Sequence, residues 1–93
     1  MIHHIVQWTL KDPAEAPRFK ALLDGCAGLV PGMLAFEVGI RTPELEASTD
    51  VVLVSAFADA AALDAYQRHP QHQAVAVQLG PMRRGRHVLD FER

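Results

Sequence analysis

The first eleven residues alternate between two sets of side chains, one more apolar than the other. The more apolar set holds Ile2, His4, Val6, Trp8 and Leu10, and the other holds His3, Ile5, Gln7, Thr9 and Lys11. A period of two that is rich in β-branched and aromatic residues predicts a β-strand. We therefore expect an N-terminal strand whose more apolar side faces a layer of helices.

The apolar pattern changes to a helical period over residues 12–32. Side chains three and four positions apart form one stripe: Phe19, Leu22, Leu23, Cys26, Leu29 and Val30. Asp12 is the expected N-cap, with Pro13 at the first helical position. Because Pro17 would cost a hydrogen bond inside a helix, regular helix is expected to begin there, and Pro31-Gly32 to end it.

The remaining sequence predicts three more strands and two more helices. The strands span 33–41, 50–58 and 86–92, and the helices span 60–69 and 71–79. The 50–58 run is nearly continuous in apolar residues, which favours a central strand covered on both faces. Asp59 is expected to cap the first of these helices, which must stop at His69 because Pro70 disfavours helical backbone before it. Gly80-Pro81 is expected to close the second helix.

The expected order of elements is strand–helix–strand–strand–helix–strand. This is the ferredoxin-like βαββαβ arrangement, an α+β protomer whose four-stranded antiparallel sheet carries its helices on one face. The other face, which includes His3, Ile5 and Gln7, would be bare in a monomer. Since 49% of the residues are hydrophobic, a second copy of the chain is the simplest cover for that face.

Composition and charge narrow the class of protein. A length of 93 residues suits one domain over 1–93, and a net charge of −2 gives no general attraction to nucleic acid or anionic lipid. No apolar run approaches the roughly 20 residues that cross a bilayer. Cys26 is the only cysteine, so no internal disulfide forms. We expect a cytoplasmic domain that binds neither nucleic acid nor membrane.

The segment from Tyr66 to His72 concentrates the candidate chemistry. It holds the only tyrosine and two of the five histidines. Because Pro70 breaks the helix that would align His69 with His72, and no cysteine or acidic cluster surrounds them, a metal site is disfavoured. A second candidate is the basic run RRGRH at 83–87, expected in a loop, which is either solvated or a site for an anion.

Four segments resemble the stress-responsive α/β-barrel (Dabb) family. They are the opening MIHHIVQWTLK, the Pro-Gly turn and strand in LVPGMLAFEVG, the segment FADAAALDAYQRHPQH and the closing VLDFE. The third is the most recognisable, because its tyrosine is followed by His-Pro-x-His. The resemblance covers nearly the whole chain. It implies a ferredoxin-like protomer that dimerises with the two sheets facing each other, forming an α+β barrel.

The resemblance also implies candidate site residues. One branch of the family contains a cofactor-free polyketide cyclase with a pocket between sheet and helices, while other members have no assigned activity or form stable oligomers. Carried over to this chain, the cyclase pattern implies that His72 acts as acid and base, with Tyr66 and His4 beside it. The sequence departs from that pattern at Leu23, where the cyclase type has a tyrosine, so the resemblance does not extend to a polyketide substrate.

Two hypotheses of function follow. In the first, each protomer has a small-molecule pocket for cofactor-independent acid–base chemistry, such as enolisation, isomerisation or cyclisation of a carbonyl compound. The expected lining of that pocket is His4, Val6, Trp8, Leu23, Tyr66 and His72. In the second, the protein is a non-enzymatic, stress-related or structural dimer. Tyr66 is then a core aromatic, His72 caps a helix and His4 is a buried, hydrogen-bonded histidine. Neither hypothesis requires a metal or cofactor.

Overall fold

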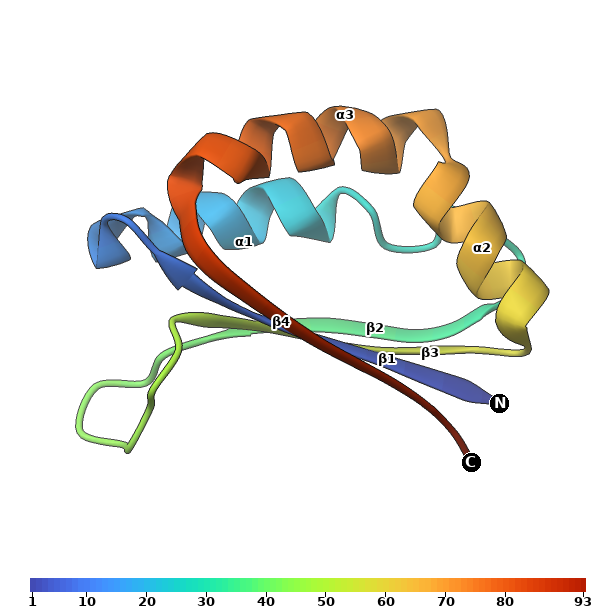
Figure 1. Ribbon diagram of the computed structural model, residues 1–93, viewed down its shortest axis with the longest axis horizontal. Helices are drawn as coiled ribbons and strands as arrows, with labels where there is room; N and C mark the ends of the chain where they lie inside the picture. The colour runs from blue at the N-terminus through green and yellow to red at the C-terminus, as the bar shows by residue number, and fades with distance from the viewer.

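The computed structural model describes the whole chain, Met1–Arg93, with its elements in the expected order. The strands are β1 (Ile2–Leu10), β2 (Met33–Ile40), β3 (Val51–Phe57) and β4 (Arg83–Glu92). The helices are α1 (Ala16–Asp24), α2 (Ala60–Arg68) and α3 (Pro70–Leu79), with the short 3-10 turns η1 (Pro13–Glu15) and η2 (Gly80–Met82). All three helices lie on one side of the sheet (Figure 1). No helix combines the length and apolar character needed to cross a bilayer.

The sheet has the strand order β2-β3-β1-β4, and every neighbouring pair is antiparallel. β1 and β3 occupy the centre, so β1 contacts both β3 and β4. Residues directly opposite each other share a face of the sheet. The architecture confirms the predicted α+β, ferredoxin-like βαββαβ fold.

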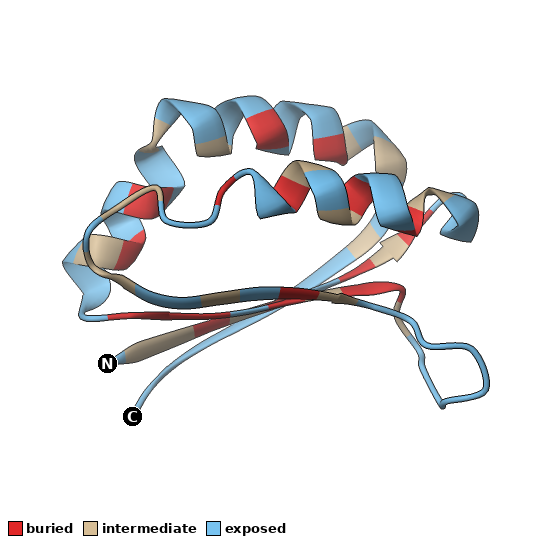
Figure 2. Cartoon of the chain, turned by 180° about the vertical axis from the view of Figure 1, so that it is seen from behind, coloured by how far each residue is buried: buried red, intermediate tan, exposed pale blue.

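The core lies between the sheet and the helices. Figure 2 shows buried residues on the helix sides that face the sheet and along the central strands. The more apolar side of β1 is buried throughout its inner positions, as the alternation predicted, and the ring of Trp8 meets that of Phe19 at 5.2 Å between centroids. The buried stripe of the first helical region is Ala16, Phe19, Leu23 and Cys26. Leu22, Leu29 and Val30 are only half-buried against it.

The first helix ends earlier than the sequence pattern predicted. The Asp12 carboxylate caps η1 by accepting the Ala14 N–H at 3.0 Å, and regular helix starts at Ala16. α1 stops at Asp24, not at Pro31-Gly32. The physical reason is the pair of glycines that follows: Gly25 weakens the helix and Gly28 adopts a left-handed φ of 72°.

Two expectations about the strands are wrong. β4 begins at Arg83 rather than at residue 86, because its pairing with β1 continues as far as Leu10. The basic run 83–87 therefore lies in a strand, not in a loop. β3 is central, as predicted, but within one chain the helices cover only one of its faces, and Val54 on the other face is 44% exposed.

The uncovered side of the sheet, here called the open face, carries a row of apolar side chains. Val54, Ile5 and Leu89 lie opposite one another across β3, β1 and β4. Leu89 is 65% exposed and Phe91 is 43% exposed. Figure 1 shows the 42–50 segment reaching past the sheet on this same side. Exposed apolar surface of this kind typically marks an interaction site.

Gly32 stands where the chain passes closest to α2. A Cβ at this position would lie 2.5 Å from the Cβ of Ala62, while the Gly32 carbonyl accepts the Ala58 N–H at 2.8 Å and holds the chain in place. We expect Gly32→Ala to lower the free energy of unfolding by about 1–3 kcal/mol, measured by urea denaturation. The control is Gly80→Ala, where the added methyl meets nothing within 4 Å. A Gly32→Ala protein as stable as wild type would contradict this close packing.

Candidate functional site

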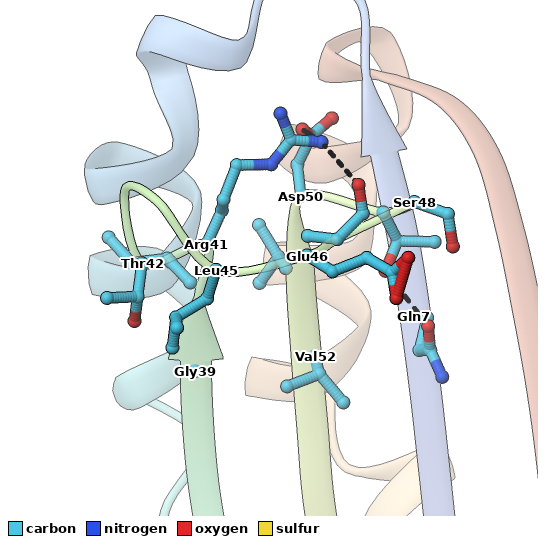
Figure 3. A pocket seen from close by; sticks show the side chains of 13 residues that line it. Gln7, Gly39, Arg41, Thr42, Leu45, Glu46, Ser48, Asp50 and Val52 are labelled. Atoms are coloured by element: carbon cyan, nitrogen blue, oxygen red, sulfur yellow. Dashed lines mark hydrogen bonds and ion pairs between the residues drawn. The ribbon is translucent and has the colours of Figure 1, made fainter.

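A wide hollow beside the 42–50 segment opens on the sheet side opposite the helices. Its volume is about 790 Å³, and Figure 3 shows Gln7 and Val52 of the sheet beneath the segment that carries Leu45 and Glu46. Two of its ionisable groups form an ion pair with each other, since the Asp50 carboxylate lies 3.4 Å from the Arg41 guanidinium. It contains no histidine, tyrosine or cysteine. We therefore assign the hollow to the open face.

A second cavity of about 380 Å³ lies between the sheet and the helices. It is lined by His4, Val6 and Trp8 of β1, Leu53 of β3, Leu23 of α1, Tyr66 of α2, His72, Val75, Ala76 and Leu79 of α3, and Arg83 and Arg86 of β4. The structure thus brings all six residues of the expected pocket into one space. Their chemical roles stay predictions.

The corner at Pro70 sets Tyr66 and His72 side by side. α2 ends at Arg68, His69 has extended backbone, and α3 restarts at Pro70, which is favourable at a first helical position. The rings of Tyr66 and His72 are 4.6 Å apart between centroids. The cap of α3 is His69, whose Nδ1 accepts the Gln71 N–H at 3.1 Å. His72 is therefore not the capping residue that the structural hypothesis expected.

His72 is held as a neutral base. Its Nδ1 lies 3.1 Å from the Gln67 carbonyl, which can only accept, so Nδ1 carries the hydrogen and donates it. In the neutral ring the lone pair is then on Nε2. Burial lowers the pKa of His72, and the hydrogen bond to the Gln67 carbonyl opposes this effect in part. The nearby Arg86 guanidinium lowers the pKa further. At neutral pH the ring is therefore an acceptor of protons.

Tyr66 supplies a free donor in the same cavity. Its side chain is 1% exposed, and its hydroxyl is buried without a hydrogen-bond partner in the protein. Burial, with a smaller contribution from Cys26, raises the pKa of Tyr66 far above its ordinary value, so the hydroxyl keeps its proton. Leaving such a group unpaired costs about 1–3 kcal/mol. A bound molecule with an acceptor oxygen would recover that free energy.

His4 is oriented by a partner that the sequence analysis did not identify. Its Nδ1 is hydrogen-bonded to the carboxylate of Asp90, which lies directly opposite on β4, and its carbonyl accepts the Ser55 hydroxyl at 2.7 Å. Because a carboxylate accepts, Nδ1 is the protonated nitrogen and Nε2 remains free. The alternation of residues in β4 predicts that Asp90 lies on the same face as Val88. It does not predict that Asp90 pairs with His4, because that depends on the register between β4 and β1.

Arg83 and Arg86 reach the cavity through an irregularity in β4. Arg86 is opposite Trp8 and Gly85 is opposite Thr9, but Leu10 is opposite Arg83, so Arg84 is an extra residue. Residues three apart in a regular strand point to opposite faces, and a bulge brings them to the same one. The glycine inside RRGRH was the sequence signal for this bulge.

Two other chemistries lack the necessary groups. No cluster of three or more histidine, cysteine or acidic side chains is arranged to hold a metal ion. Cys26 is fully buried, and burial raises the pKa of its thiol, which keeps it protonated and a poor nucleophile. The groups in the cavity that could take part in chemistry or bind a ligand are therefore its two histidines, its tyrosine and its two arginines.

The strand order and the one-sided helix layer define a ferredoxin-like α+β protein. The chain belongs to the Dabb family, the stress-responsive A/B barrel domain, whose family model matches residues 2–93. This confirms the resemblance found in the sequence. No curated protein matches the chain.

Solved structures from several bacteria have the same fold. A Dabb family protein from Mesorhizobium loti is 26% identical, with a TM-score of 0.81 over 99% of this chain and 95% of that one. A dimeric ferredoxin-like protein of unknown function from Jannaschia sp. is 29% identical, with a TM-score of 0.77 over 99% and 98%. A further dimeric ferredoxin-like protein, from Thermobifida fusca, is 22% identical with a TM-score of 0.87 over 99% and 90%.

Proposed function

We propose that this Dabb protein is a single-domain, cytoplasmic homodimer in which each protomer performs cofactor-independent acid–base chemistry on a small carbonyl compound. The observation that carries the proposal is the Tyr66 hydroxyl, which is buried, protonated and unpaired beside His72. A buried hydrogen-bond donor without a protein partner suits an oxygen that becomes negatively charged during reaction. The free Nε2 of His72 suits the proton that must leave carbon.

The proposed reaction begins with proton transfer from carbon to nitrogen. The Nε2 of His72 takes a proton from the carbon next to the carbonyl, and the electron pair of that C–H bond forms the enolate double bond. The Tyr66 O–H donates to the enolate oxygen as its charge develops. Return of the proton to another carbon gives isomerisation. Attack of the enolate carbon on a second carbonyl gives cyclisation, and the protonated His72 returns its proton to the alkoxide that forms. No oxidant or reductant is consumed.

His4 provides a second ring for proton transfer in the proposed site. Its ring centroid lies 6.5 Å from that of Tyr66, on the opposite layer from α3. The Asp90 carboxylate holds Nδ1 and fixes the ring's orientation, which leaves Nε2 for the substrate. Asp90 acts through His4 and is a positioning residue. With this assignment both histidines have the same tautomer, in which Nδ1 carries the hydrogen and Nε2 exchanges protons with the substrate.

The proposed dimer buries the open face against a second copy. The apolar row of Val54, Ile5 and Leu89 needs a cover, and two of the structural relatives are described as dimeric. Sheet-to-sheet packing would leave the helix-side cavity of each protomer separate from the interface. The two halves of the proposal can therefore be tested independently.

Tyr66→Phe tests the proposed chemistry. Wild-type protein should accelerate exchange of the methyl protons of 4-acetylbenzamide, a neutral aryl ketone, in D₂O, followed by ¹H NMR. The variant should exchange them about 10- to 100-fold more slowly, because one hydrogen bond to a charged oxygen is lost, while its melting temperature stays the same or rises. Free imidazole at equal concentration is the control. Exchange no faster than with imidazole, or equal rates for the two proteins, would contradict the proposal.

A further inference from the structure

We infer that the cavity is built for an anionic substrate, a small and otherwise apolar carbonyl compound whose carboxylate is held by Arg83 and Arg86. This inference rests on the proposed function, because it names the substrate class of the same cavity. It follows from the charges that line the cavity, from where they stand along β1 and β4, and from the size of the space.

The lining of the cavity is positive at one end and contains no acidic side chain. Arg83 and Arg86 line it, and neither aspartate nor glutamate does. Elsewhere Arg41 and Arg68 lie 3.4 and 3.1 Å from Asp50 and Asp64. None of the ion pairs in the protein uses Arg83 or Arg86. Both guanidinium groups are therefore available, and a guanidinium matches the planar carboxylate through two parallel hydrogen bonds.

The strand register separates the two arginines from His4 along the sheet. Asp90 is opposite His4, whereas Arg86 is opposite Trp8, four residues further along β1. At about 3.3 Å per residue, this places the backbone of Arg86 roughly 13 Å from the level of His4. Trp8 and Leu79 line the space as apolar walls. The arrangement suits a ligand with its carboxylate at one end and its reactive carbonyl at the other.

The size of the cavity limits the body of the ligand. A volume of about 380 Å³ is near the lower end of the roughly 300–1,000 Å³ found for small-molecule sites. Arg86 also has a second effect, since its charge contributes to the lowered pKa of His72. A compact, single-ring keto acid fits these limits, with its carboxylate neutralising the arginines and its ketone beside Tyr66.

The test compares 4-acetylbenzoate with 4-acetylbenzamide, which have nearly the same shape and differ in charge. Binding of each is measured by calorimetry at low ionic strength. Wild type should bind the acid about tenfold or more tightly than the amide, because its charge pairs with two guanidinium groups. Arg83→Met/Arg86→Met should remove this preference by weakening binding of the acid about tenfold or more. The matched control is Arg84→Met, because Arg84 is the extra residue of the bulge and does not line the cavity.

The outcomes separate this inference from the proposed function. Equal binding of acid and amide to wild type overturns the inference, while catalysed exchange of the amide still supports the acid–base site. A preference for the acid that survives the double substitution also overturns the assignment to these arginines. If neither compound binds at millimolar concentration, both proposals fail for this substrate class. If the double variant has a much lower melting temperature than wild type, Arg86→Met is measured alone. It should reduce the ratio of amide to acid dissociation constants from about tenfold to about threefold or less.

Discussion

Replacing His72 by asparagine is expected to lower the rate of catalysed proton exchange by about 10²–10⁴-fold, the usual contribution of a positioned acid–base group. The asparagine amide nitrogen can take the place of Nδ1 and keep the hydrogen bond to the Gln67 carbonyl, while Nε2 is lost. The melting temperature should therefore change little. The rate is measured with 4-acetylbenzamide in D₂O by ¹H NMR.

The pH dependence of the rate provides a second signature of His72. Burial lowers its pKa, so the rate should rise with pH and level off below the ordinary histidine value of about 6.5. The same shift affects stability. The folded state holds fewer protons on His72 than the unfolded chain does, so the free energy of unfolding falls as pH drops below about 6.5. His72→Asn should remove both the acid limb of the rate and this part of the acid sensitivity.

His69→Asn is the matched control for His72. His69 does not line the cavity, and it caps α3 through a side-chain acceptor, a role that asparagine performs well. Its substitution should leave the rate near that of wild type. The opposite pattern for His72→Asn, a much lower melting temperature with the exchange rate retained, would favour the hypothesis of a non-enzymatic dimer with structural histidines.

Leu89→Asp is expected to convert the proposed dimer into a monomer. Leu89 is at the β4 end of the apolar row on the open face, directly opposite Ile5, and it is 65% exposed in the single chain. A two-fold interface over this face would bury the new carboxylate in both copies. Burying an unpaired charge costs several kcal/mol, so the dimer should dissociate about a thousandfold more readily. Sedimentation or light scattering at micromolar concentration measures the change.

Val77→Asp tests whether the effect of a new charge depends on its location. Val77 lies on α3 and is 76% exposed, so it is an apolar surface residue similar to Leu89 but on the helix layer. The Val77→Asp protein should stay dimeric. A wild-type protein that is monomeric at micromolar concentration, or equal dissociation of both variants, would show that the open face is not the dimer interface.

Local sequence patterns determined most of the fold. The alternation of residues 2–10 gave β1 and its buried side, because period-two spacing alone assigns side chains to the faces of a strand. Asp59 and Pro70 likewise fixed the ends of α2, since capping and the restriction before proline act within a few residues. The motif around the Pro70 corner, with the strand-one histidine, also gave the three residues His4, Tyr66 and His72 of the proposed site.

Only the tertiary structure decided what completes the cavity. Asp90 and His4 are 86 residues apart in the chain, and their contact depends on the register between β4 and β1. The bulge that places both Arg83 and Arg86 on the helix-side face exists because β4 pairs with β1 as far as Leu10. Spacing and capping are set by neighbours along the chain, whereas register is set by partners across the sheet. The sequence by itself therefore identified the histidines, the tyrosine and the basic run 83–87. The fold supplied the carboxylate that orients His4 and placed Arg83 and Arg86 beside the same cavity.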